Sequence, residues 1–100
     1  MDKYNVKVTP RAIRDLDDIF NYIALEKLAP ENAFGQTERI REALKKLEIM
    51  PQSHQDRQTG RYAGRGYKQL LVDNYVVIFK IDEKQRIVTV LTIQYQGRNL

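Results

Sequence analysis

The stretch YVVIFKI, residues 75–81, decides the fold, because it is apolar on both faces of an extended strand. Alternate residues of a strand point to opposite faces. A strand that is apolar on both faces is typical of the centre of a sheet. Strand-like stretches at 67–71 and 86–93 flank it, and the short polar turns 72–74 and 82–85 join the three. The last third of the chain therefore predicts a meander, with one face covered by helices and the other open to a partner.

A short strand and two amphipathic helices are predicted ahead of this meander. Alternation over residues 4–8 indicates the strand, and Thr9-Pro10 marks a helix start, because threonine caps free amides and proline fits the first helical position. Pro30 stops that helix near residues 28–29 and opens a second one, which ends at Met50-Pro51. Apolar residues recur at spacings of three and four in both helices. These stripes comprise Ile13, Leu16, Phe20, Ile23, Ile40, Leu44 and Leu47.

Together these patterns predict an α+β fold of the order β-α-α-β-β-β. The helix hairpin, two antiparallel helices with a very short connection, packs on one face of a small, mainly antiparallel sheet. With 100 residues, the chain is expected to form a single domain spanning residues 1–100.

Composition narrows the classes of function. Apolar residues make up 42% of the chain, so it is not a disordered protein, and no apolar run approaches the length of a membrane span. No signal peptide is visible, and cysteine is absent, which removes disulfides and thiolate metal sites. We therefore expect a cytoplasmic protein that needs neither metal nor cofactor. The net charge of +4 favours an anionic partner, either nucleic acid or an acidic protein.

The long loop of residues 51–66 holds the strongest candidates for binding. Arg61 and Arg65 lie among glycines and tyrosines, a pattern that suits phosphates and stacked bases and equally suits a carboxylate-rich protein. The single histidine, His54, has no Ser, Cys or acidic partner at a recognisable spacing, so we interpret it as an ordinary loop residue.

Three aspartates share the first half of the first predicted helix: Asp15, Asp17 and Asp18. They could be read as an acidic metal cluster. We interpret them instead as a solvated face, which the helix dipole favours near a helix N-terminus.

In this order, the elements resemble the RelE/ParE superfamily of bacterial type II toxin–antitoxin modules. The resemblance covers nearly the whole chain. Its most specific parts are TPRA at 9–12, DLDDI at 15–19, YI at 22–23, YKQL at 67–70, YVVIFKI at 75–81 and GR at 97–98. The resemblance implies a cytoplasmic bacterial toxin that inhibits growth or serves plasmid stabilisation. It also implies a co-expressed antitoxin that neutralises the toxin in a hetero-oligomer. We expect this antitoxin to place acidic and apolar side chains against the hairpin and the basic loop.

The superfamily divides into two activities. RelE-like members cut ribosome-bound mRNA without metal, whereas ParE-like members have a long helix hairpin and poison DNA gyrase. RelE-like members usually carry an arginine just after the aromatic residue that opens the middle strand, and this chain has Val76 there. The resemblance therefore favours the ParE-like activity, with no catalysis by the chain itself.

Two alternatives remain open on the sequence. For a RelE-like endoribonuclease, the catalytic candidates are Tyr95, Arg98 and Lys68. The candidates for binding the target or RNA are Arg61, Arg65, Lys68 and Arg98. The second alternative is a non-toxic basic module that binds RNA or an acidic protein.

Overall fold

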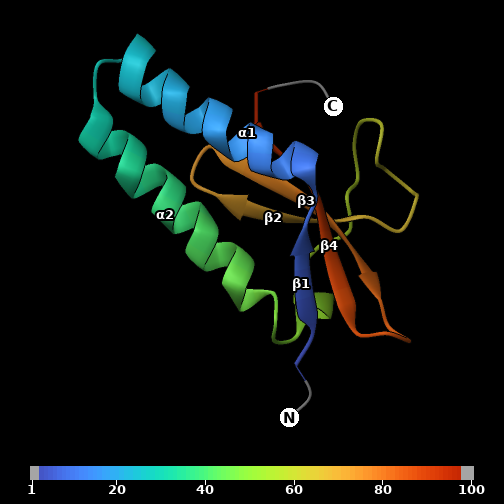
Figure 1. Ribbon diagram of the computed structural model, residues 1–100. Helices are drawn as coiled ribbons and strands as arrows, with labels where there is room; N and C mark the ends of the chain where they lie inside the picture. Colours follow the sequence, from blue (N-terminus) through green and yellow to red (C-terminus); the bar gives the residue numbers. More distant parts are fainter. Residues whose placement is uncertain (1–2, 98–100) are drawn as a thin grey trace.

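The computed structural model describes residues 3–97 and confirms the predicted α+β order of elements. These are β1 (Asn5–Val8), α1 (Pro10–Asn21), the π-helical turn η1 (Tyr22–Glu26), α2 (Pro30–Lys46), the 3-10 turn η2 (Pro51–Ser53), β2 (Lys68–Val72), β3 (Tyr75–Asp82) and β4 (Ile87–Tyr95). The strands form one sheet in the order β1-β4-β3-β2 (Figure 1). β1 runs parallel to β4, and the other neighbours are antiparallel. The first strand therefore pairs with the last and closes the fold.

The core lies between the helix hairpin and one face of the sheet, as predicted. α1 and α2 run side by side across that face (Figure 1). The buried core residues are Tyr4, Ala12, Leu16, Ile19, Ile40, Leu44, Leu47, Val72, Tyr75, Val77, Phe79, Val88, Val90 and Ile93. None of the helices among residues 3–97 is long and apolar enough to cross a membrane.

The buried face of α1 is rotated relative to the predicted stripe. Ile13 is 51% exposed, and Ala12 is fully buried in its place. The cause lies at the helix start, where the amide of Thr9 donates to the carbonyl of Val90 (3.1 Å) and its hydroxyl donates to that of Leu91 (2.9 Å). These bonds hold the first turn close to β4, where the small side chain of Ala12 fits.

Phe20 was also predicted to pack on the sheet, and this is wrong. The ring is half-buried against Phe34 of α2, with ring centroids 4.9 Å apart in an edge-to-face arrangement. This ring contact links α1 to α2 and stabilises the hairpin. Phe34 itself is 65% exposed, so an apolar surface remains on α2 at this position.

The second helix ends earlier than the predicted Met50-Pro51. α2 stops at Lys46, and tighter turns follow, in which the amide of Leu47 donates to the carbonyl of Leu44 at 3.1 Å. These turns bring the carbonyl of Glu48 to the amide of Tyr4, at 2.8 Å. The helix end is thus set by a tertiary contact with the start of β1.

The second face of the sheet is not open at its centre, contrary to the prediction. Val76 and Ile78 point away from the helices, yet they are only 1% and 0% exposed. Ile78 lies beside Gln69 of β2, and the Gln69 side chain accepts a hydrogen bond from Arg57 at 2.9 Å. The centre of this face is therefore not accessible to a partner at Val76 and Ile78.

The long loop begins as an extra rung on the outer edge of β2. The amide of Gln69 donates to the carbonyl of Gln55 (2.9 Å), and the amide of Arg57 donates to that of Tyr67 (2.8 Å). Residues 58–66 then project away from the sheet (Figure 1).

Candidate functional site

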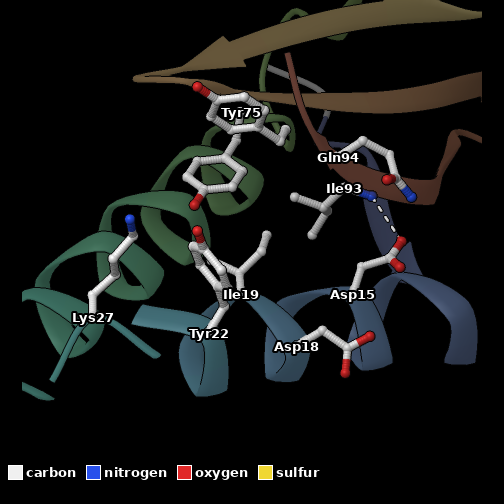
Figure 2. Close-up of a pocket in the computed structure, with 9 residues that line it drawn as sticks. Asp15, Asp18, Ile19, Tyr22, Lys27, Tyr75, Ile93 and Gln94 are labelled. Carbon is white, nitrogen blue, oxygen red and sulfur yellow. Dashed lines mark hydrogen bonds between the residues drawn. The ribbon is translucent and has the colours of Figure 1, made fainter. Parts of the chain in front are cut away.

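A groove of about 670 Å³ lies between α1 and the C-terminal half of β4 (Figure 2). It exists because β1 is short: its pairing with β4 ends at Val8 and Val90, and beyond that point α1 lies beside β4 in place of a strand. The residues that line it are Asp15, Asp18, Ile19, Tyr22, Lys27, Tyr75, Ile93, Gln94 and Tyr95.

Asp15 joins the two walls of this groove. Its Oδ2 atom accepts hydrogen bonds from the hydroxyl of Thr92 (2.6 Å) and from the backbone amide of Ile93 (3.0 Å). Figure 2 shows the carboxylate directed at that amide. The interpretation of Asp15 as part of a solvated face is therefore wrong, whereas Asp17 and Asp18 are exposed as expected. Within residues 3–97, no group of three acidic, His or Cys side chains could hold a metal ion.

Three tyrosines form the aromatic wall of the groove. Tyr75 is buried, and its ring meets that of Tyr95 edge-to-face with centroids 5.8 Å apart. Burial raises the pKa of Tyr75 above its ordinary value, and the neighbouring Tyr95 and Tyr22 raise that pKa further. Tyr75 therefore stays neutral and offers a ring face and a hydroxyl. At the end of the groove, the ammonium of Lys27 lies 5.6 Å from the Tyr22 ring centroid.

Neither Tyr22 nor Tyr75 was predicted from the sequence as a site residue. The available signal was spacing, since Tyr22 lies seven residues after Asp15 and hence on the same helix face. Spacing does not show that Tyr75 lies beside this helix face, because that depends on how α1 packs against β4 in the folded structure.

Lys68, predicted as a catalytic and binding residue, already interacts with two groups of the chain itself. Its Nζ atom donates to the carboxylate of Asp56 (2.8 Å) and to the carbonyl of His54 (3.0 Å). The His54 ring lies edge-on to Phe79 at 5.8 Å, and partial burial, followed by the charge of Lys68, lowers the pKa of His54. His54 thus has a structural position, as expected of an ordinary loop residue.

The structure does not bring Lys68 and Tyr95 together. Lys68 pairs with Phe79, whereas Tyr95 pairs with Tyr75. These two positions on β3 are four residues apart, about 13 Å along the strand. Lys68 also lies on the edge strand β2, with β3 between it and Tyr95 on β4.

The remaining candidates either do not line the groove or lie outside the described residues. Arg61 and Arg65 are exposed in the projecting loop, close in sequence to Tyr62 and Tyr67, whose rings meet edge-to-face with centroids 5.0 Å apart. Arg98 lies outside the described residues.

Comparisons with known proteins identify a family and several solved structures that are similar to this chain. The family model described as the ParE toxin of the type II toxin–antitoxin system parDE matches residues 6–100. No curated protein matches the chain.

Several solved structures share the fold. A chain of the chromosomal ParDE toxin–antitoxin system from P. aeruginosa is similar with a TM-score of 0.75 and 23% identity, covering 93% of this chain and 96% of that one. A chain of the RelBE2 toxin–antitoxin complex from Mycobacterium tuberculosis gives 0.63 and 21%, covering 98% and 97%. The archaeal RelE–RelB complex from Pyrococcus horikoshii gives 0.65 and 19%, covering 96% and 98%. At these identities the structures establish the fold, while the family model spans almost the entire sequence. The chain belongs to the family of ParE toxins of type II toxin–antitoxin systems.

Proposed function

We propose that this toxin stops bacterial growth by poisoning DNA gyrase and that a cognate antitoxin neutralises it in a cytoplasmic hetero-oligomer. The family supports the toxin role. The antitoxin partner is supported by the structural neighbours from M. tuberculosis and P. horikoshii, which are toxin–antitoxin complexes.

The separation of Lys68 from Tyr95 is the main observation that favours gyrase over ribosome-bound mRNA as the target. RNA cleavage by the 2′-hydroxyl needs a base, an acid and a cation around one phosphate. Here the candidate cation is paired with Asp56, and the candidate phenol lies two strands away, against Tyr75. This arrangement argues against a nuclease centre built from these two residues.

The position of Val76 supports the same choice. Val76 occupies the place where RelE-like members carry an arginine, and its side chain is buried beside Leu71 and Gln94. An arginine there would have to displace this packing to reach a phosphate. The long hairpin of α1, η1 and α2 agrees with the ParE-like activity as well.

Expression without the antitoxin tests the proposal in cells. We expect DNA breaks and an SOS response to precede any arrest of translation. Early translational arrest with cleaved mRNA would instead support RelE-like chemistry. Normal growth at confirmed expression would support a non-toxic binding module and overturn both toxin mechanisms.

A further inference from the structure

We infer that the second face of the sheet, which is turned away from the helices, binds the phosphate backbone of duplex DNA through a row of cationic and polar side chains. This cationic row runs across the strands and comprises Lys7, Thr89, Lys80, Tyr67 and Arg57. The inference deepens the proposed function and rests on it, because gyrase is the target proposed for this toxin and gyrase acts on DNA.

Strand register aligns the first three members of the cationic row. Lys7 of β1 pairs with Thr89 of β4, and Thr89 pairs in turn with Lys80 of β3. Neighbouring strands lie about 4.8 Å apart, so the backbones at Lys7 and Lys80 are separated by about 10 Å. Two lysines and the hydroxyl between them are therefore held in line by the backbone of the sheet.

The row continues at the edge strand β2. Lys68 pairs with Phe79, so Tyr67, one residue before Lys68, lies opposite Lys80. The ammonium of Lys80 accordingly lies 5.3 Å from the centroid of the Tyr67 ring. The amide of Arg57 donates to the carbonyl of Tyr67 at 2.8 Å, which makes Arg57 the last member of the row.

The side chains of Lys7 and Lys80 both point away from the helices. Along β3, Lys80 follows Ile78 by two residues and points the same way, beyond the buried centre of this face. Lys7 lies between Val6 and Val8, which both pack against the core, so its side chain is directed to the second face. Both lysines are exposed, and a hollow of about 620 Å³ lies beside Lys80.

The positive charges of the row are not compensated by carboxylates. Within residues 3–97, no ion pair is formed by Lys7, Lys80 or Arg57. Arg57 donates from Nε to the carbonyl of Thr59 (3.0 Å) and from Nη1 to the side chain of Gln69 (2.9 Å), and both acceptors are neutral. In a chain of net charge +4, three such cations in one row attract a polyanion.

Two carboxylates line the hollow on one side of the row, at the end of β3 and in the turn that follows. Asp82 accepts the amide of Gln85 at 3.1 Å, and Glu83 accepts the phenol of the core residue Tyr4. Lys84 also lines the hollow and offsets one of these charges. A phosphate backbone therefore follows the row across the strands and does not extend toward this turn.

The chemistry of the row fits duplex DNA. Protein interfaces draw most of their affinity from buried apolar anchors, whereas phosphates are bound by the cations and hydroxyls that the row presents. Single-stranded nucleic acids rely on aromatic rings on which bases stack. Here the Tyr67 ring already contacts the ammonium of Lys80 and the ring of Tyr62. Duplex DNA needs no such ring and carries one charge per about 1.7 Å.

Binding of the purified toxin, separated from its antitoxin and without gyrase, to a short fluorescent DNA duplex tests the inference. Fluorescence anisotropy over a series of salt concentrations gives the affinity and its salt dependence. We expect Lys7→Gln and Lys80→Gln each to weaken binding by about threefold or more and to reduce the slope of log affinity against log salt by about 1. Failure of the wild type to bind the duplex at low salt would overturn the inference.

Two control variants show whether the position of the charge matters. Lys45→Gln removes the same charge from the exposed side of α2, which covers the other face of the sheet, and should bind DNA like wild type. Lys80→Arg keeps the charge and should keep the affinity. Equal losses in Lys45→Gln and Lys80→Gln, or equal losses in Lys80→Arg and Lys80→Gln, would contradict the cationic row. Tighter binding of single-stranded RNA than of the duplex would overturn the assignment to DNA.

Gyrase assays separate this inference from the proposed function. If the wild type does not cause gyrase-dependent DNA cleavage, the proposed function fails, whether or not the toxin binds DNA. If the wild type and the double variant Lys7→Gln/Lys80→Gln cause cleavage at the same concentration, only the DNA-binding inference fails. We expect the double variant to require about tenfold more protein, while Lys45→Gln acts like wild type.

Discussion

The carboxylate of Asp15 takes the place of a neighbouring strand beside Ile93. It accepts a hydrogen bond from the backbone amide of Ile93 at 3.0 Å. The same oxygen accepts a hydrogen bond from the hydroxyl of Thr92 at 2.6 Å, and Thr92 is fully buried. One side chain of α1 thus satisfies two polar groups of β4 that β1 is too short to reach. It also fixes the distance between the two walls of the groove.

Replacing Asp15 with alanine should therefore destabilise the fold. The variant leaves the amide of Ile93 and the hydroxyl of Thr92 without their acceptor, and we expect a loss of about 2–3 kcal/mol in the free energy of unfolding. Urea denaturation of both proteins measures it. Asp17→Ala, on the exposed face of the same helix, is the control and should stay within about 0.5 kcal/mol of wild type. Equal stability of Asp15→Ala and wild type would show that the contact is not needed.

The aromatic pair Phe20–Phe34 should stabilise the hairpin independently of the sheet. Because the rings meet edge-to-face at 4.9 Å, a double-mutant cycle to alanine should give a coupling energy of about 0.5–1.5 kcal/mol. Thermal or urea unfolding of wild type, the two single variants and the double variant supplies the four values. Additive effects of the two substitutions would mean that the rings stabilise the protein separately.

His54 should make stability depend on pH. Partial burial and the charge of Lys68 hold the pKa of His54 below its ordinary value of 6.5. On acidification the unfolded chain binds the proton first, so the contribution of His54 is fully present above the unfolded pKa and is lost as pH falls through the folded pKa. Between about pH 7.5 and about pH 5, wild type should lose more stability than His54→Gln. Identical pH profiles of the two proteins would contradict this.

Much of the fold could be predicted from local patterns. Apolar residues on both faces identify the central strand, and Thr9-Pro10 marks the start of α1. The rotation of α1 could not be predicted, because bonds from Thr9 to β4 set it across more than 80 residues of sequence. Ile13 and Ala12 are adjacent, and periodicity alone does not say which of them faces the sheet.

The site was harder to predict than the fold. Arginines in a glycine-rich loop attract attention in a sequence, and Arg61 and Arg65 are indeed exposed. The groove depends instead on where β1 ends relative to β4, which is a property of register. Asp15 looks like a surface carboxylate until β4 is placed beside it, and Lys68 looks available until Asp56 is placed beside it.

The most direct test of the proposed mechanism combines purified toxin, separated from its antitoxin, with DNA gyrase and plasmid DNA, and in parallel with ribosomes translating a defined mRNA. We expect gyrase-dependent DNA cleavage with intact mRNA, and the same result for Tyr95→Phe, because the Tyr95 hydroxyl has no chemical role in gyrase poisoning. Ribosome-dependent mRNA cleavage that is lost in Tyr95→Phe, with gyrase unaffected, would contradict the account.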